Sequence, residues 1–352
     1  MTLPQPAATT ELWGHAEAEQ ILLQLALSVR MPHAWIFTGP AGVGKATLAF
    51  RFARFLLYRG FSGAAAHTTA TDLDLFGAAP AGVPITPTDL SIPPEAPVFS
   101  QVAAGSHPDL LLIAPEEDAR DLTVEQIRAV APFLALTAAQ SGWRIVIIDG
   151  AERMNRAAQN ALLKVLEEPS PNSLLILLGE NLGRLLPTIR SRSRVLRMQA
   201  GPDQGVPDLS RFDVRLSDLA AQSRDQLWHM AGRTPGQLLQ LLDQDALVIF
   251  EHLHGYMQSA DPARADELAR GFSHAPQFQV AGRMLMWCLH QLAARPENPF
   301  LPGLPRVRLP QLLKFHEDAQ SMLAETAQLN LDGAACWHEL LARLPTIFEA
   351  RT

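Results

Sequence analysis

Cysteine is nearly absent from this sequence, and so are long apolar runs. The two cysteines, Cys288 and Cys336, lie far apart, and there is no C-x-x-C pair. This scarcity argues against a disulfide framework and a thiolate zinc site, and it fits a reducing cytosol. No apolar run approaches the ~20 residues of a membrane-spanning helix, and no signal-peptide pattern opens the sequence. We therefore predict a cytoplasmic protein without a membrane partner.

Positive charge is not in excess either. The formal net charge of −7 argues against non-specific nucleic-acid binding over the whole surface, although a local basic patch is compatible with it. A hydrophobic content of 47% with 18% charged residues is ordinary for a globular protein. The 352 residues are enough for two or three domains, each with its own core.

A nucleotide-binding pattern occupies residues 34–58. An apolar run that predicts a buried strand leads into a G-x-x-x-x-G-K match at residues 39–45, and a segment with helical spacing follows. Strand, glycine loop and helix together are typical of a P-loop, in which backbone N–H groups and the helix N-terminus hold phosphate. Lys45 is expected to contact the β- and γ-phosphates. The predicted nucleotide site consists of Gly39, Gly42, Gly44, Lys45, Ala46, Thr47 and Asp149.

The magnesium ligand of this P-loop is missing. Ala46 stands where a serine or threonine normally holds the metal. Thr47 does not replace it, because a shift of one residue rotates a side chain by about 100° around a helix. Magnesium is therefore expected to bind weakly at most, and we predict no dedicated metal site.

The residues that activate water are also incomplete. Asp149 ends an apolar strand, as does the aspartate that supports magnesium in P-loop ATPases, but the next residue is Gly150 rather than a catalytic glutamate. Glu152 is expected in the first turn of the following helix, where the helix dipole favours a carboxylate. Without the metal ligand and the base, efficient ATP hydrolysis by this chain alone is not expected.

The predicted elements divide the chain into four parts. Residues 1–10 are rich in Pro, Ala and Thr and are expected to be disordered. In residues 11–199 apolar strands alternate with helices, which predicts a parallel sheet covered on both faces. Within this part, residues 59–106 are rich in Gly, Ala, Thr and Pro and predict an irregular, disordered insertion. Residues 200–244 and 245–352 predict a small and a larger helical domain.

Further motifs carry a family resemblance. LLKVLEEP (162–169) and LLPTIRSRS (185–193) resemble the clamp-loader branch of the AAA+ superfamily, and within that branch the family of delta-prime subunits of bacterial DNA polymerase III. HPDL after the insertion and QLNLD (328–332) near the C-terminus fit as well. The resemblance implies an AAA+ P-loop domain, then a helical lid over 200–244 and an all-α oligomerising collar over 245–352.

Several positions depart from the ATP-hydrolysing relatives in this family. Their four-cysteine zinc module has no counterpart in residues 59–106, so the resemblance implies no zinc. The sensor 1 position falls near Gly179 or Glu180, and Gly236 stands where a sensor 2 arginine touches nucleotide. This is the pattern of a non-hydrolysing subunit. Weakly bound ATP and no bound ATP both stay open, because Lys45 and the glycine loop are retained.

One functional element of the family is retained. Ser191 and Arg192 match the Ser-Arg of the family's Ser-Arg-Cys motif, with Ser193 in place of the cysteine. The resemblance implies that Arg192 reaches the ATP of a neighbouring subunit as a trans arginine finger, a contribution worth ~10³–10⁵ in rate. The alternative to the finger role is that Arg192 and the neighbouring arginines form a solvent-exposed basic face. The remaining arginines of the cluster are interpreted as contacts to a partner or to the DNA backbone: Arg190, Arg194 and Arg197.

Three functions compete at this point. The resemblance favours a stator-like clamp-loader subunit in DNA replication without catalysis of its own. Its implied partners are the tau/gamma and delta subunits, the beta sliding clamp and primer-template DNA within the complex. The second hypothesis is a catalytically active AAA+ ATPase acting on DNA, against which Ala46 and Gly150 argue. The third is a sequence-specific DNA-binding regulator, and the C-terminal helices have few clustered Lys or Arg residues to support it.

Overall fold

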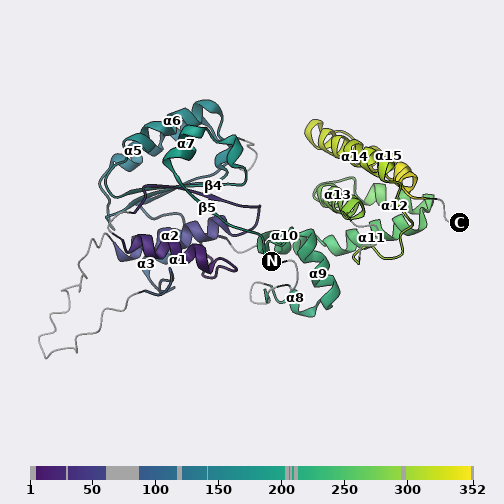
Figure 1. Cartoon of the computed structure of the whole chain (residues 1–352), viewed down its shortest axis with the longest axis horizontal. Helices are drawn as coiled ribbons and strands as arrows, with labels where there is room; N and C mark the ends of the chain where they lie inside the picture. Colours follow the sequence, from purple (N-terminus) through teal and green to yellow (C-terminus); the bar gives the residue numbers. More distant parts are fainter. Residues whose placement is uncertain are drawn as a thin grey trace, which may run out of the picture. The chain divides into compact units, whose positions relative to one another are not determined.

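The chain forms two compact units, residues 2–201 and residues 202–352, which are described separately (Figure 1). The computed structural model describes residues 5–28, 31–60, 87–116, 121–140, 142–202, 206, 208–209, 213–294 and 299–349. The division lies close to the predicted boundary at 199/200. The finer boundary between a lid and a collar at 244/245 stays a prediction.

A five-stranded parallel sheet in the order β2-β3-β4-β1-β5 forms the centre of the first unit. β1, β3 and β4 are buried along their whole length, as expected for parallel strands covered on both faces. The register aligns the carboxyl ends of the strands at one edge, where Thr38 pairs with Gly179 on one side and Arg197 on the other. The strands are β1 (Ala34–Thr38), β2 (Leu110–Ile113), β3 (Arg144–Ile148), β4 (Ser173–Gly179) and β5 (Arg194–Arg197).

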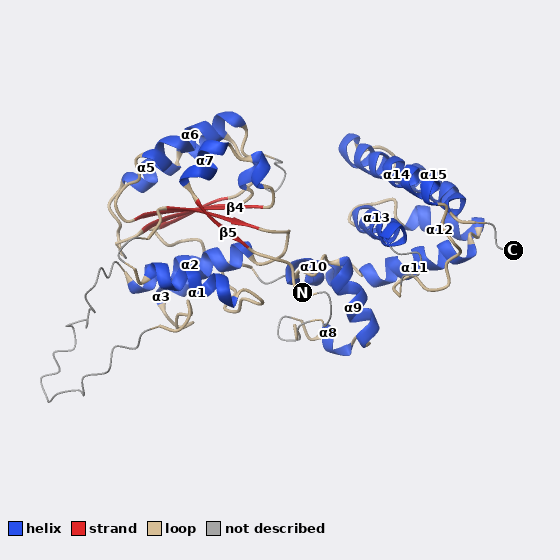
Figure 2. Cartoon of the chain, viewed as in Figure 1, coloured by secondary structure: helices blue, strands red, loops and turns tan. Residues whose placement is uncertain are grey.

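Helices cover both faces of this sheet (Figure 2). One face carries α1 (Ala16–Ala26), α2 (Lys45–Arg59) and α3 (Pro97–Ala103). The other carries α4 (Val124–Arg128), α5 (Val130–Ala135), α6 (Arg156–Glu167) and α7 (Pro187–Arg192). The alternation along each strand builds two cores, so that Trp35 and Phe37 belong to the first and Ala34 and Ile36 to the second. Short 3₁₀ segments are η1 (Ala151–Arg153) and η2 (Leu182–Arg184). The predicted α/β fold, a parallel sheet with helices on both faces, is confirmed.

The N-terminal segment differs from the expected disorder. Residues 5–10 are held by hydrogen bonds to α2, where Arg54 donates to Ala7 O at 2.8 Å and to Thr9 O at 2.6 Å. Burial lowers the pKa of Arg54 to about 10. The disorder prediction is therefore wrong for residues 5–10, because a buried guanidinium needs these carbonyls as partners. Residues 1–4 lie outside the described part of the chain.

The predicted irregular insertion at 59–106 also contains a helix. α3 packs against α2, and the guanidinium of Arg54 lies 4.5 Å from the centre of the Phe99 ring. The prediction is therefore wrong for α3, although the prolines made it reasonable. Pro97 takes the first helical position, where no backbone N–H is needed. Residues 61–86 lie outside the described residues.

The amphipathic segment of residues 122–138 forms two short helices, α4 and α5, which meet at Ala129. Pro132 explains the break, because it has no N–H to donate to the carbonyl of Arg128 and its ring crowds that carbonyl. α4 begins with a capping box, in which Gln126 N donates to Thr123 Oγ1 at 3.2 Å.

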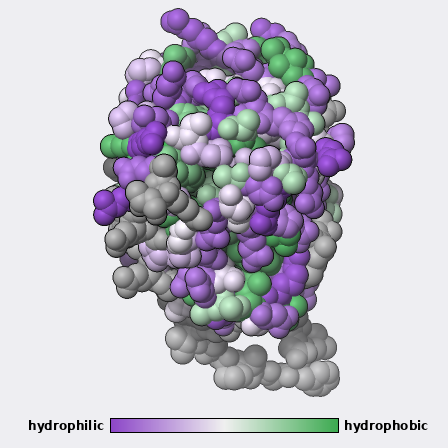
Figure 3. All heavy atoms as spheres, turned by 90° about the vertical axis from the view of Figure 1, so that its right-hand side faces the viewer, coloured by the Kyte–Doolittle hydropathy of each residue, from purple (hydrophilic) through white to green (hydrophobic). Residues whose placement is uncertain are grey.

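The second unit is helical in its described part. α11 packs with α13, α13 with α14, and α12 with α15. Hydrophilic side chains predominate in the space-filling view, with apolar ones scattered among them (Figure 3). No described helix has the length and apolar character needed to cross a membrane. The elements are α8 (Arg215–Asp218), α9 (Ala221–Met230), α10 (Pro235–Asp243), α11 (Ala246–Ser259), α12 (Pro262–Gly271), α13 (Gln277–Ala294), α14 (Leu309–Leu329), α15 (Gly333–Arg343) and η3 (Leu344–Ile347).

Candidate functional site

The P-loop joins β1 to α2 at the carboxyl edge of the sheet. Gly42 has φ 70° and Gly44 has φ 106°, left-handed conformations that glycine adopts at low cost. Gly39 is required by a close approach, because a Cβ there would lie 2.3 Å from the main-chain oxygen of Met198. The loop and the first turn of α2 therefore have the shape that lets backbone N–H groups approach a phosphate.

Lys45 begins α2 and turns back onto its own loop. Its Nζ donates to Gly39 O and to Pro40 O, each at 2.8 Å. An ammonium group has three N–H donors, so the loop carbonyls use two of them. Burial lowers the pKa of Lys45. Three nearby carboxylates oppose this shift, those of Glu180, Asp149 and Glu152. The loop carbonyls therefore leave one N–H donor of Lys45 for a bound phosphate.

The strand order brings Asp149 close to Lys45. Asp149 follows β3 and Glu180 follows β4, and both strands end at the same edge as β1. Burial raises the pKa of Asp149, whereas a hydrogen bond from the backbone of Gly150 and the charge of Lys45 lower it. The structure thus places the predicted P-loop lysine and strand-end aspartate in one electrostatic site.

At two positions that bind metal or activate water in P-loop ATPases, this chain lacks the side chain that does so. Ala46 lies in the first turn of α2 beside Thr47, and its side chain has no oxygen to offer a metal. Gly150 has φ 71°, a left-handed conformation in which a glutamate would be strained. Gly236, which stands at the predicted sensor 2 position, lies in the first turn of α10 in the helical unit.

Glu152 occupies the space beside the end of β4. A Cβ on Gly179 would lie 2.6 Å from Glu152 Oε2, so the glycine at the predicted sensor position makes room for this carboxylate. Oε2 is buried and has no hydrogen-bond partner among the described residues. The sequence predicts a helix-terminus role for Glu152, and the structure adds its contact with Gly179 in the candidate nucleotide site.

No motif in the sequence predicts the contacts that the segment before α1 makes with the P-loop. His15, the residue before α1, is buried, and its Nε2 lies 2.8 Å from Val43 O. Because a carbonyl only accepts, Nε2 carries the hydrogen and donates it. Burial lowers the pKa of His15, although this hydrogen bond acts in the opposite direction. Leu12 reaches Gly44 from the same segment, 3.2 Å from where a Cβ would lie.

Arg192 is the last residue of α7, on the face of the sheet opposite α2 (Figure 2). Its Nη2 lies 3.1 Å from Glu167 Oε1, and its Nη1 donates to Thr188 O at 3.3 Å. The side chain of Arg192 is 39% exposed and that of Glu167 is 52% exposed. The structure therefore separates the candidate finger from Lys45 and presents it at the surface of the first unit.

A buried glutamine docks the segment that carries Arg192. Gln159 of α6 accepts a hydrogen bond from Leu186 N at 2.7 Å, and its Nε2 donates to Arg184 O at 3.0 Å and to Met154 O at 2.9 Å. Leu186 is the N-cap residue of α7. Ile189 fixes the same helix by complete burial. The position of α7 is therefore set by α6.

The remaining arginines of the cluster lie on α7 and β5, which contact each other. Arg190 belongs to α7, and Arg194 and Arg197 begin and end β5. The guanidinium of Arg194 lies 5.5 Å from the centre of the Trp35 ring, a cation–π contact within its own unit. The predicted partner or DNA contacts of these arginines stay predictions.

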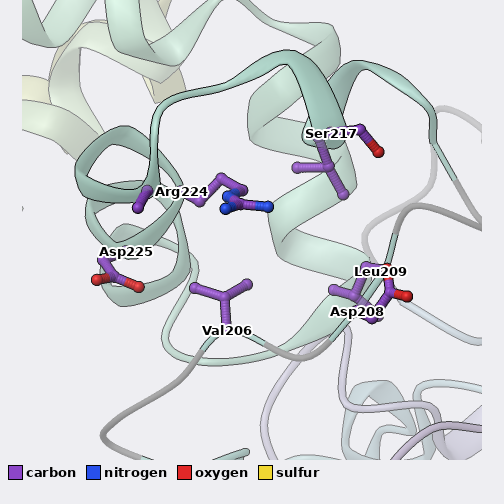
Figure 4. A pocket seen from close by; sticks show the side chains of 8 residues that line it. Val206, Asp208, Leu209, Ser217, Arg224 and Asp225 are labelled. Atoms are coloured by element: carbon purple, nitrogen blue, oxygen red, sulfur yellow. The ribbon is translucent and has the colours of Figure 1, made fainter.

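A pocket of about 230 Å³ lies in the helical unit, and none of its lining residues belongs to the nucleotide site that the sequence predicts. Arg224 extends its guanidinium toward the centre of this pocket (Figure 4). The pocket is lined by Val206, Asp208, Leu209, Leu216, Ser217, Ala221, Arg224 and Asp225. Within the described residues, no three His, Cys, Asp or Glu side chains are grouped so that they could hold a metal ion.

Comparisons with known proteins address the family resemblance. Residues 91–201 match the family model described as DNA polymerase III, delta subunit. The chain is 34% identical over 215 residues to the DNA polymerase III subunit delta' of Pseudomonas aeruginosa, an alignment that covers 60% of this chain and 56% of the relative. It is 44% identical over 138 residues to the subunit delta' of Haemophilus influenzae, covering 39% and 40%.

The similarity extends to a second kind of subunit. The chain is 31% identical over 192 residues to the DNA polymerase III subunit gamma/tau of Mycobacterium bovis, covering 54% of this chain and 28% of that relative. The matches thus span about half, or less, of the relatives' own length. The resemblance to the delta-prime family that the motifs predict is confirmed by these relatives.

Proposed function

We propose that this chain, a relative of the delta-prime subunits of bacterial DNA polymerase III, is a stator-like clamp-loader subunit in DNA replication. In this proposal the chain hydrolyses little or no ATP and supplies Arg192 to the ATP site of a neighbouring subunit. The proposal depends on one contrast. The chain's own nucleotide site lacks the P-loop hydroxyl that binds metal and the glutamate that activates water, whereas Arg192 is exposed on a firmly docked helix.

The nucleotide site supports the first half of the proposal. The glycine loop and Lys45 suit a phosphate, so ATP would be held there by backbone N–H groups and by this ammonium. Magnesium would lack the hydroxyl absent at Ala46, and water would lack a base after Asp149. Lys45 also donates to its own loop carbonyls, which makes weak nucleotide binding the expected behaviour.

The arginine-bearing helix supports the second half. A finger acts by placing positive charge beside a γ-phosphate, so it must lie at the surface and be held in a defined direction. Arg192 meets both requirements, because its side chain is exposed and α7 is docked by Gln159. The neighbour that receives it is proposed to be a tau/gamma subunit.

The wider assembly follows from the same proposal. The helices of residues 245–352 would contribute to an oligomerising collar, and the complex would include the delta subunit, the beta sliding clamp and primer-template DNA. Leu309 and Leu313, one turn apart on α14, are each about half exposed and offer apolar surface for such contacts. Mixing the purified chain with delta and tau/gamma subunits on a sizing column tests the assembly directly, and failure to co-elute would contradict it.

The finger is tested by Arg192→Ala in the reconstituted loader. Complex formation should be unchanged, whereas the DNA-stimulated ATPase should fall because the one site completed by Arg192 loses most of its ~10³–10⁵-fold contribution. The control is Arg156→Ala, an exposed arginine at the start of α6 outside this cluster, which should retain the rate. An unchanged rate in Arg192→Ala would refute the finger role.

The competing function, an active AAA+ ATPase, is tested on the chain alone. We expect its ATP turnover to equal that of Lys45→Ala, because neither protein can position both metal and water. ATP turnover that requires Lys45 would instead support an active ATPase. This function is the alternative because Lys45 and Asp149 are retained.

A further inference from the structure

The candidate finger is paired with a carboxylate of its own subunit, and this pairing carries a further inference. We propose that Glu167 is the resting counter-ion of Arg192 and holds it on its own subunit until the γ-phosphate of a neighbour's nucleotide displaces the carboxylate. The inference rests on the proposed finger role and adds a regulatory residue to it.

The position of Glu167 is fixed by the same elements that fix Arg192. Glu167 is the last residue of α6, because Glu168 leaves the helical conformation at φ −125° and ψ 71° and Pro169 follows. α6 and α7 pack against each other, and Gln159 joins them through Leu186 N. The carboxylate therefore faces the guanidinium without help from any other subunit.

The geometry leaves Arg192 able to exchange partners. Thr188 O accepts from one of the five N–H donors of the guanidinium and Glu167 Oε1 lies 3.1 Å from Nη2, so at least three donors remain for an incoming anion. Both paired side chains are partly exposed, so water screens their attraction. The pair favours this orientation of Arg192 only modestly, and it is weak enough for a phosphate to compete with it.

Charge decides the direction of the effect. A phosphate that approaches Arg192 also approaches the Glu167 carboxylate, and the two anions repel each other. Engagement of the finger therefore either opens the ion pair or brings the two anions together, and either event has a cost that lowers the engaged fraction. An exposed pair contributes ~0.2–1 kcal/mol, which corresponds to about a 1.5- to 5-fold reduction of the rate before DNA stimulates it.

The test is Glu167→Gln in the reconstituted complex with delta and tau/gamma subunits. This change keeps the shape of the side chain and removes its charge. The ATPase rate without DNA should rise about 1.5- to 5-fold, and the stimulation by primer-template DNA should shrink by the same factor. The matched control is Glu168→Gln, the exposed neighbour for which no ion pair occurs within the described residues, and it should leave both rates unchanged.

A second pair of variants separates this inference from the finger itself. Glu167→Gln combined with Arg192→Ala should have the same rate as Arg192→Ala alone, because Glu167 acts only through Arg192. An increase that persists without Arg192, or a Glu167→Gln rate equal to that of Glu168→Gln, would overturn the counter-ion role and leave the finger intact. If Arg192→Ala by itself retains the full rate, the finger is refuted and the inference falls with it.

Discussion

Gln159 provides the most direct test of how the fold positions Arg192. Replacing it by leucine keeps a similar volume in the core between α6 and α7 but removes all three hydrogen bonds of the amide. Leu186 N then loses its acceptor, and the carbonyls of Arg184 and Met154 lose their donor. We expect α7 to loosen at its N-cap residue, Leu186, and Arg192 to lose its defined direction six residues later.

The magnitude follows from which groups water can reach. Met154 is buried, so its carbonyl has little access to water, whereas Arg184 is exposed and Leu186 is half-buried. An unsatisfied buried group costs ~1–3 kcal/mol and a rehydrated one much less, so the total loss should be about 2–4 kcal/mol. With a urea slope of about 2–3 kcal/mol/M, the unfolding midpoint of the first unit should fall by about 1 M.

Two measurements check this expectation. Urea unfolding gives the midpoint, and hydrogen exchange of the α7 amides shows whether the loss is local to that helix. In the reconstituted complex the DNA-stimulated ATPase should decrease toward the Arg192→Ala rate. The control is Asn160→Leu, an exposed position on the same helix. If Gln159→Leu unfolds at the same urea concentration as Asn160→Leu, the reasoning about this buried amide is wrong.

The remaining predictions concern the P-loop and its supports. Because burial lowers the pKa of His15, the folded state binds fewer protons than the unfolded state just below the ordinary value of 6.5, so stability should fall as the pH decreases through that window. His15→Gln, which keeps an N–H donor, should lose less stability between pH 7.5 and 5.5 than the wild type. The control, the exposed His290→Gln, should behave as the wild type. Equal pH profiles of stability for all three proteins would contradict the role of His15 in this pH dependence. Gly39→Ala should destabilise the first unit by about 1–3 kcal/mol, because its Cβ would meet the backbone of Met198. The control, Gly271→Ala, has open space around its Cβ and should be neutral or slightly stabilising. Denaturant midpoints measure both effects, and an unchanged midpoint for Gly39→Ala would refute the close approach.

The sequence was sufficient wherever a feature depends on residues that are neighbours along the chain. The apolar run, glycine loop and amphipathic segment of 34–58 predict β1, the P-loop and α2 because each is governed by local periodicity or backbone freedom. The missing hydroxyl at Ala46 and the glycine after Asp149 are covalent facts that no folding changes. Local reasoning failed where a partner elsewhere in the chain decides the conformation. Residues 5–10 are ordered because Arg54 binds their carbonyls, and α3 forms against α2 although the prolines around it predicted irregular structure.

What the sequence determined by itself is therefore a P-loop fold with an incomplete nucleotide site and a retained Ser-Arg motif. The tertiary structure decided how these parts are held. It turned Lys45 onto its own loop, placed Glu152 against Gly179, and paired Arg192 with Glu167. Glu152 and Gly179 meet because β3 and β4 are neighbours in the sheet, and Glu167 meets Arg192 because α6 packs against α7. Contacts of this kind depend on distances in space rather than along the chain, so no periodicity or motif spacing could have specified them.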